Sequence, residues 1–350
     1  MLYSQVKSRE AGKKAVPSLI LALTFLPLVL GLSACRDKPT DSELEALQRE
    51  AIARNDVMIA THNNDQSLLN WQLLVEGQIG SQQARTFNWQ ELNALATTSV
   101  KTKEPHHTSE DSPVLNFRGV AVSKLLDQFE VEPEVEEVTF VTDDGYRATV
   151  SMADLRKYPI IIALERNGEK ISRSQGGPLY LVFPHQDYPQ LQSKYPSPFW
   201  AFYITNLVVG TEPIKLRVGK QRLDAATLAK LPQKTLESEV SYGGSWQAGG
   251  VKLSGVLLKE ALKAAQLTLS NTSTVTVQDK SAMNQEGSPI GLTASEVEEC
   301  NFLLATHWGN NLQPIPARMG GPVTLAPSSN CQSLDNDRHW VTFVEALEVN

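Results

Sequence analysis

The chain has 350 residues, of which 41% are hydrophobic, and it carries 32 basic and 39 acidic side chains, a formal net charge of −7. This length and apolar content suffice for two domains that each bury a hydrophobic core. The acidic balance excludes nucleic acid as an expected partner, because binding to phosphates needs a basic surface.

The first 34 residues have the pattern of a secretory leader. Basic residues lie near the start, an apolar run follows from residue 15 to residue 32, and the run ends in Leu32-Ser33-Ala34-Cys35. This ending resembles a lipobox, in which Cys35 is acylated and becomes the new N-terminus. An ordinary cleaved leader and a transmembrane anchor are the alternatives, but the run is marginal in length for a span.

The lipobox resemblance implies a bacterial lipoprotein of the cell envelope that faces the periplasm and is held to the membrane by its lipid. Arg36 follows Cys35, where an aspartate would indicate retention in the inner membrane by enteric-type sorting, so we expect the outer membrane. Removal of the leader takes away four basic residues and Glu10, which lowers the formal net charge to −10.

Residues 35–70 are polar and indicate a tether. Thr40 and Glu43 have capping-box spacing for a short helix, and a loop rich in Asn and Asp follows. From Trp71 onward the chain contains a repeat of about 140 residues. The clearest matching segments are Leu74-Val75-Glu76-Gly77 with Leu216-Arg217-Val218-Gly219, Phe117-Arg118-Gly119-Val120 with Leu253-Ser254-Gly255-Val256, and Gly176-Gly177-Pro178-Leu179 with Gly320-Gly321-Pro322-Val323. We therefore expect two domains, residues 71–210 and 211–350.

Strands outnumber helices in the predicted elements of each copy. Apolar and β-branched runs predict strands at 138–141, 148–150, 160–164, 179–183 and 202–209. Short helices are expected at 122–129 and 152–156, and Asn88 and Asp224 should each cap another. The pattern predicts an α+β fold with mixed sheets and short helices.

Two cysteines remain once Cys35 is used by the lipid. Cys300 and Cys331 form an even pair in an oxidising compartment, so we predict a disulfide between them. Two separate buried thiols are the alternative. Neither their spacing nor their neighbours indicate a metal site.

The first copy resembles the molybdopterin-binding domain of the sulfite oxidase family across most of residues 71–210. The resemblance is carried by Phe117-Arg118-Gly119-Val120, Asp144-Gly145-Tyr146, Asp154-Leu155, the stretch from Ala163 to Asn167-Gly168, and Gly176-Gly177-Pro178-Leu179-Tyr180-Leu181-Val182-Phe183-Pro184. It implies two sulfite-oxidase-like domains in tandem, the second degenerate because it has no Asp-Gly-Tyr turn. It also implies a pterin or molybdopterin-like ligand.

The sequence departs from this family at the metal. The family holds molybdenum through two dithiolene sulfurs and one protein thiolate, and the resemblance implies that the thiolate would lie around Ser99 to Lys103. No cysteine is present there or in the matching residues 237–242. Tyr180 and Thr324 also stand where the family tends to have an arginine for the cofactor phosphate. We therefore expect no metal and no catalytic residue.

The predicted ligand-binding residues lie around the Asp-Gly-Tyr turn and the Gly-Gly-Pro loop of the first copy. They are Lys101, His106, Tyr146, Arg147, Gly176, Gly177, Pro178 and Tyr180. A tyrosine offers a stacking face, an arginine offers a fork of donors, and glycines let backbone approach a ligand. The alternatives are an exposed hairpin turn, a tight structural loop and, for His106-His107, a solvated loop.

The resemblance is closer to periplasmic relatives that keep the fold and lack the cysteine. Some of these bind pterins and signal to a membrane-bound sensor that makes or degrades cyclic-di-GMP. We therefore expect a lipoprotein that binds a pterin-like ligand without catalysis and contacts a membrane sensor protein. A molybdopterin-dependent oxidoreductase without a cysteine ligand is one alternative, and a structural envelope interaction protein is another.

Overall fold

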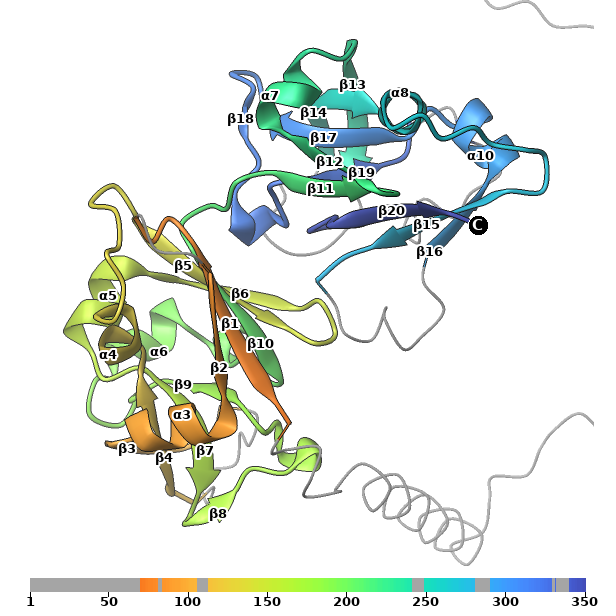
Figure 1. The fold of residues 1–350 in the computed structure, drawn as a ribbon. Helices are drawn as coiled ribbons and strands as arrows, with labels where there is room; N and C mark the ends of the chain where they lie inside the picture. The colour runs from red at the N-terminus through yellow and green to blue at the C-terminus, as the bar shows by residue number, and fades with distance from the viewer. Residues whose placement is uncertain are drawn as a thin grey trace, which may run out of the picture. The chain divides into compact units, whose positions relative to one another are not determined.

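The computed structural model describes residues 70–80, 84–105, 113–240, 249–280, 290–328, 331 and 340–350. The chain divides into two compact units, Met1–Arg54 and Asn55–Asn350, and all described residues belong to the second. The predicted leader, Cys35, the tether helix and His106 lie outside the described residues. Residues 70–210 are called the first half below and residues 211–350 the second half (Figure 1).

The first half is rich in short strands, with helices of at most seven residues. Its elements are β1 (Gln72–Gly77), β2 (Arg85–Asn88), α3 (Trp89–Leu95), β3 (Thr98–Thr102), β4 (Leu115–Ala121), α4 (Val122–Leu126), β5 (Glu137–Thr142), β6 (Arg147–Ser151), α5 (Met152–Lys157), β7 (Ile161–Arg166), β8 (Glu169–Lys170), η1 (Arg173–Gln175), β9 (Tyr180–Val182), α6 (Gln190–Lys194), η2 (Ser197–Phe199) and β10 (Ile204–Val209).

Two mixed or antiparallel sheets are built from these strands. One has the order β2-β1-β10-β5-β6, and the other has the order β3-β4-β7-β8 with β9 also paired to β7. Strand β1 pairs in parallel with β10, so the first and last strands of this half are neighbours. This pairing closes the half on itself, since its two ends lie in one sheet (Figure 1).

The described elements of the second half follow the same order, without counterparts of α6 and η2. They are β11 (Lys215–Val218), β12 (Gln221–Asp224), α7 (Ala225–Ala229), β13 (Gln233–Val240), β14 (Gly249–Leu257), α8 (Leu258–Ala264), β15 (Thr274–Gln278), β16 (Ile290–Thr293), α10 (Ala294–Glu299), β17 (Leu303–Trp308), β18 (Gln313–Pro314), η3 (Ala317–Met319), β19 (Thr324–Ala326) and β20 (Ala346–Val349). Its sheets have the orders β12-β11-β20-β15-β16 and β13-β14-β17-β18 with β19 on β17. The two strand orders therefore correspond strand by strand.

A glycine in the middle of β4 explains the Phe-Arg-Gly motif. A Cβ on Gly119 would lie 2.1 Å from the carbonyl oxygen of Ile162 on β7, so no other residue fits without moving backbone. The ladder between β4 and β7 also shifts register at Arg118/Gly119. In the second half a Cβ on Gly255 would lie 2.0 Å from the carbonyl oxygen of Leu304, and the register shifts at the same point. The glycine thus recurs in both copies because the same close contact between two strands recurs in both halves.

The helix signals in the sequence correspond to helix starts in the structure. The Asn88 side chain accepts a hydrogen bond from the Glu91 backbone in a capping box, and the Asp224 side chain does the same for Thr227. Helix α4 ends at Leu126, three residues before the predicted end. There the chain tightens into a turn, which places Phe129 in the core, 6.1 Å from the ring of Phe87.

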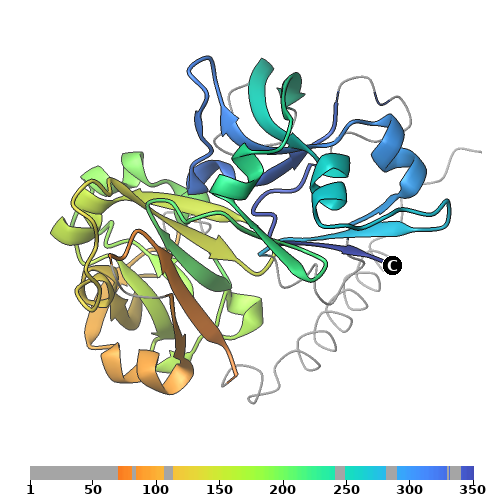
Figure 2. The same ribbon diagram turned by 45° about the horizontal axis from the view of Figure 1, so that its top comes forward.

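Each half has its own hydrophobic core, and corresponding helices cover corresponding places. Helices α4 and α5 pack together in the first half, and α8 and α10 pack together in the second (Figures 1 and 2). Trp200 and Trp340 are both buried, as the sequence predicts for tryptophans at matched positions. Four buried residues form a separate small apolar cluster that joins the halves. They are Val141, Val208, Ala317 and Phe343.

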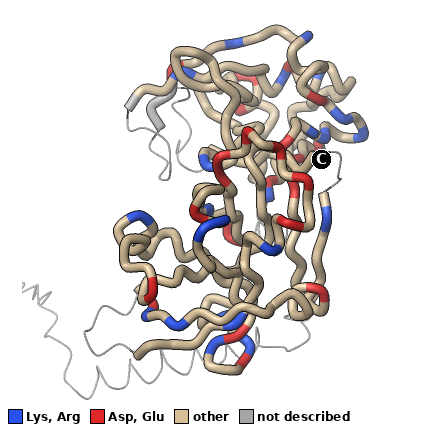
Figure 3. Tube along the Cα trace, turned by 90° about the vertical axis from the view of Figure 1, so that its left-hand side faces the viewer, with Lys and Arg blue, Asp and Glu red and all other residues tan. Residues whose placement is uncertain are grey.

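Charge is mixed along the described chain. Lys and Arg are interspersed with Asp and Glu along the trace in Figure 3. Among the described helices, none combines the length and the apolar content that a bilayer crossing requires. Cys300 and Cys331 are joined in the structure, with Cα atoms 4.8 Å apart. The bond in the isolated protein stays a prediction until its thiols are labelled.

Candidate functional site

Strand β3 leads into the first cavity of interest. Its burial alternates, so that Val100 and Thr102 face the interior whereas Ser99 and Lys101 face solvent. A cavity of about 440 Å³ begins where the strand ends. This cavity is called the β3 cavity here. The residues that line it are Thr102, Lys103, Glu104, Pro105, Val114, His185, Gln186 and Gln192. The stretch where the family resemblance calls for a thiolate therefore ends inside a cavity, and no residue of this lining contains sulfur.

Glu104 connects this cavity to a second one. It is 6% exposed and forms an ion pair of 3.2 Å with Arg166 on β7. The second cavity, of about 260 Å³, is called the glycine-loop cavity and is lined by Glu104, Arg166, Ser174, Gln175, Gly176, Phe202 and Tyr203. The two cavities thus share one buried carboxylate, and its charge partner lies at the second.

His185 is the most enclosed polar side chain of the β3 cavity after Thr102 and Glu104. Its ring stacks on Phe183 with centroids 5.6 Å apart and meets Trp200 edge-on at 5.3 Å. Burial lowers the pKa of His185 to about 4, although a hydrogen bond with the backbone of Tyr195 opposes this shift. The imidazole is therefore neutral at physiological pH, with one nitrogen able to accept a hydrogen bond.

Three buried polar atoms beside these cavities make no hydrogen bond to any residue that the structure describes. They are the Tyr180 hydroxyl, Nε2 of His185 and Nε1 of Trp200. The Tyr180 ring stacks on Phe202 at 4.6 Å, and burial raises the pKa of its hydroxyl, with the Glu104 charge adding to the effect. An unsatisfied buried polar group costs about 1–3 kcal/mol, so three together favour a polar ligand nearby.

The Gly-Gly-Pro loop borders the second cavity at one residue only. Gly176 has φ of +91°, and a Cβ there would lie 1.9 Å from the Phe202 ring. Gly177 and Pro178 are buried and joined by a cis peptide bond, and a Cβ on Gly177 would lie 1.9 Å from the carbonyl oxygen of Ile171. These glycines are required by packing within the protein, whatever ligand the cavity holds.

The corresponding loop of the second half is used for packing against the first half. Arg318, in η3, forms an ion pair of 2.8 Å with Glu137, and its carbonyl accepts a hydrogen bond of 2.9 Å from Arg147. Ala317 belongs to the small cluster that joins the halves. This loop therefore serves as an internal contact surface in the second half.

The predicted ligand residues do not gather at one site. Gly176 lines the glycine-loop cavity, and Tyr180 lies buried beside Glu104. Lys101 points to solvent on β3, Arg147 contacts the second half, and Tyr146 is 46% exposed with its hydroxyl donating to the Pro198 carbonyl. Neither Tyr146 nor Arg147 lines the two cavities, although the Asp144-Gly145 turn lies close to the glycine-loop cavity, where the Asp143 backbone N–H donates to the Tyr203 carbonyl.

Sequence reasoning missed the residues that enclose the β3 cavity. Glu104 and His185 are 81 positions apart in the chain, and each follows a strand: β3 in one case and β9 in the other. The available signal was a polar residue directly after a buried apolar strand, as in Phe183-Pro184-His185. Strands β3 and β9 belong to one sheet with β4 and β7 between them, and the residues that follow these two strands line one cavity.

The class of protein defined by these features is an α+β protein with mixed sheets and a polar cavity at the end of β3. Residues 60–189 match the family of the oxidoreductase molybdopterin binding domain. The match covers the first half only, and the mixed sheets and short helices of the described chain give the α+β fold that the sequence predicts. No curated protein matches the chain.

Among solved structures, the chain is similar to the sulfane dehydrogenase SoxCD from Paracoccus pantotrophus. The sequence identity is 12%, the alignment covers 78% of this chain and 77% of that chain, and the TM-score is 0.32. All residues of the β3 cavity except Gln192 lie within the segment that matches the molybdopterin-binding family.

Proposed function

We propose that the β3 cavity holds a molybdopterin-type cofactor and that the protein is an oxidoreductase of the molybdopterin class. In this proposal the protein contributes no thiolate to the cofactor. The observation that carries this proposal is the cavity of about 440 Å³ inside the family-matched segment, with unpaired buried polar atoms beside it. The family match favours this function over a purely structural role.

The residues present fit the organic part of such a cofactor. The Lys103 ammonium would attract an anionic group, and the Gln186 and Gln192 amides can donate and accept at a heterocycle edge. The open nitrogen of His185 adds an acceptor for an amino or ring N–H group. When bound, the cofactor would supply two-electron redox chemistry, and these side chains would orient it.

The same residues do not fit a metal held by a protein thiolate. The chain has three cysteines, none of them in residues 60–189, and Cys300 and Cys331 are joined to each other. Soft thiolate ligation is therefore absent from the matched domain. This departure supports a second candidate function, in which the domain binds a pterin without turnover and signals to a membrane partner.

Cofactor content distinguishes the two candidates. The natively purified protein is denatured, the released pterin is identified by mass spectrometry, and molybdenum is measured in the same sample. One molybdopterin and one molybdenum per chain, with electron transfer to a dye, supports the oxidoreductase. Pterin without molybdenum and without turnover supports the non-catalytic candidate. The absence of both pterin and molybdenum contradicts both candidates.

His185→Phe tests where the ligand is bound. The variant keeps a ring against Phe183 and Trp200 but removes the nitrogens, so we expect pterin occupancy to fall by about fivefold to tenfold, the loss of one hydrogen bond. His307→Phe is the matched control, because His307 lies on β17 in the second half and bonds Thr306. Unchanged pterin occupancy in His185→Phe, with a normal melting temperature, would show that the ligand does not bind in the β3 cavity.

We also propose that the protein is a lipoprotein of the cell envelope, anchored through Cys35. This rests on the sequence from Leu32 to Cys35 after an apolar run. Cys35→Ser should move the protein from the washed membrane fraction to the soluble fraction, because two or three acyl chains hold far more firmly than protein contacts alone. A variant that stays wholly in the membranes would contradict the lipid anchor.

A further inference from the structure

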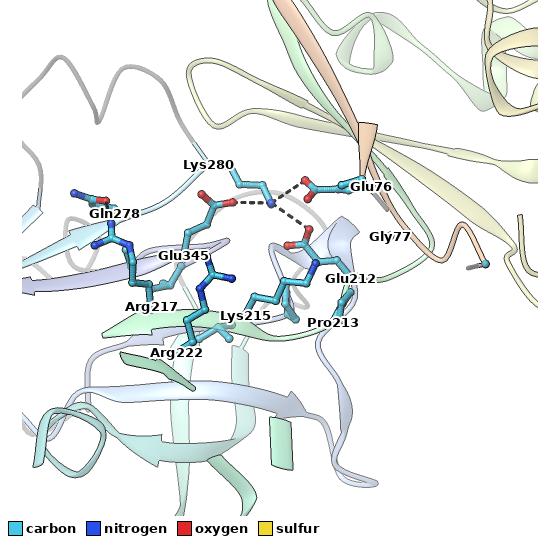
Figure 4. Close-up of a pocket in the computed structure, with 16 residues that line it drawn as sticks. Glu76, Gly77, Glu212, Pro213, Lys215, Arg217, Arg222, Gln278, Lys280 and Glu345 are labelled. Carbon is cyan, nitrogen blue, oxygen red and sulfur yellow. Dashed lines mark hydrogen bonds and ion pairs between the residues drawn. The ribbon is translucent and has the colours of Figure 1, made fainter. Parts of the chain in front are cut away.

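A third cavity lies between residues of the first and second halves, and it is strongly charged. Its volume is about 680 Å³. It is called the junction cavity here. Four basic and three acidic residues line it: Lys215, Arg217, Arg222, Lys280, Glu76, Glu212 and Glu345 (Figure 4). Glu76, Glu212 and Glu345 gather around Lys280 and are called the acidic wall. Lys215, Arg217 and Arg222 lie on the hairpin of β11 and β12 and are called the basic wall.

The acidic wall is satisfied from within the protein. Lys280, with 3% of its side chain exposed, contacts Glu76 and Glu345 at 2.8 Å and Glu212 at 3.1 Å (Figure 4). Burial raises the pKa of Glu212 to about 8, against the opposing effect of Lys280 and with the Glu76 charge adding to it. One buried ammonium thus engages all three carboxyl groups, and they do not compete for the other cations.

The basic wall is one face of the hairpin formed by β11 and β12. Lys215 and Arg217 are two positions apart, and Arg217 lies directly opposite Arg222 in the antiparallel register. The alternate residues Leu216, Val218 and Leu223 are buried in the core, and so the three cations share the opposite face. Two like charges directly opposite each other destabilise a strand pair.

Only one of these three cations has a protein partner in the described part of the chain. Arg217 bonds Glu348 at 2.6 Å and Gln278 at 3.0 Å. The side chains of Arg222 and Lys215 form no hydrogen bond or ion pair with a described residue, and they reach into the junction cavity (Figure 4). Two cationic groups therefore face the cavity with their donors open.

The matching hairpin of the first half shows the difference. There the helix-capping Asn88 lies opposite Gln72, and two residues earlier Thr86 lies opposite Leu74. In the second half the helix-capping Asp224 lies opposite Lys215, and two residues earlier Arg222 lies opposite Arg217. Thr86 and Leu74 thus stand in the first half where the second half has its two facing arginines, so this pair of cations is particular to the second half.

We propose that the junction cavity binds a small oxyanion, a carboxylate or phosphate group, through Arg222 and Lys215 with Arg217 behind them. A guanidinium fork binds such groups with two parallel hydrogen bonds, and an anion between Arg217 and Arg222 removes their repulsion. This site is separate from the β3 cavity and does not depend on the proposed cofactor. The ligand class follows from the open donors on one wall and the satisfied carboxylates on the other.

Titration of the purified mature chain with inorganic phosphate and, separately, with succinate at low ionic strength tests the proposal. We expect saturable binding of at least one of them by calorimetry, and the tighter one identifies the phosphate or the carboxylate source. Arg222→Gln should weaken that binding by about tenfold, the effect of losing a charge-assisted pair of hydrogen bonds. Arg222→Lys keeps the charge without the fork and should give an intermediate loss.

Lys234→Gln is the matched control, because Lys234 is an exposed cation on β13 of the same half and does not line the cavity. It should leave the affinity within twofold of the parent chain. Absence of saturable binding of both anions overturns the proposal, and so does an equal loss in Arg222→Gln and Lys234→Gln, which would indicate a general charge effect. Melting curves of each variant, recorded without anion, establish that the fold is intact.

Discussion

Lys280→Met should lower the free energy of unfolding of the protein by about 3–5 kcal/mol, the usual effect of removing one partner from a buried charge cluster. Lys280 contacts three carboxyl groups, and the Glu76 and Glu212 side chains are only 15% and 12% exposed. Without the ammonium these two carboxyls face each other with no positive charge between them. Urea unfolding of the parent and the variant at pH 7 measures the difference.

The matched control is Lys259→Met, at an ion pair of the same residue types. Lys259 lies 3.8 Å from Glu298, and the two side chains are 31% and 63% exposed. Exposed pairs contribute little, so this variant should lose less than about 1 kcal/mol. Similar losses in both variants, or a loss below about 1 kcal/mol in Lys280→Met, would contradict the role of the buried cluster.

The pH dependence of Lys280→Met gives a second readout. Burial raises the pKa of Glu212 to about 8 in the folded protein, above its ordinary value of 4.5, so the folded state binds more protons than the unfolded state between these values. Stability therefore falls as pH rises through this window. Removal of Lys280 should steepen the fall between pH 6 and 8, and adding Glu212→Gln should remove most of it.

Loss of the predicted Cys300–Cys331 bond should lower the free energy of unfolding by about 3–4 kcal/mol in the loop-entropy model. The two positions are separated by 31 residues, so the bond closes a loop of moderate length. Cys300 caps the end of α10 and both cysteines are buried in the core of the second half. The double variant Cys300→Ser/Cys331→Ser should unfold at a lower urea concentration than the parent chain.

Reductant supplies the control for the disulfide. Dithiothreitol should shift the urea midpoint of the parent chain toward that of the double serine variant and leave the variant itself unchanged. Labelling of thiols in denaturant without reductant should find Cys300 and Cys331 unreactive. Two labelled cysteines, or a parent chain insensitive to reductant, would favour the alternative of two separate buried thiols.

Local signals in the sequence predicted much of the strand framework. Continuous apolar runs located β5, β6, β7 and β9, because a buried strand needs little more than such a run between turns. Asn88 and Asp224 marked helix starts because their side chains satisfy free backbone N–H groups there. The end of α4 was misplaced by three residues, since the burial of Phe129 depends on the ring of Phe87 some 40 positions earlier.

The amino-acid sequence by itself determined the α+β class, the places of several strands along the chain and the absence of a cysteine near β3, because these depend on local patterns and on residue identity. Only the tertiary structure decided which polar groups meet. Lys280 and Glu76 are 204 positions apart, and they are in contact because β1 and β15 belong to neighbouring parts of the folded chain. His185 reaches Glu104 in the β3 cavity for the same reason, whereas Tyr146 and Arg147, adjacent to a strong turn signal, do not. Sheet pairing joins segments distant in sequence, and no local pattern encodes which side chains will share a cavity.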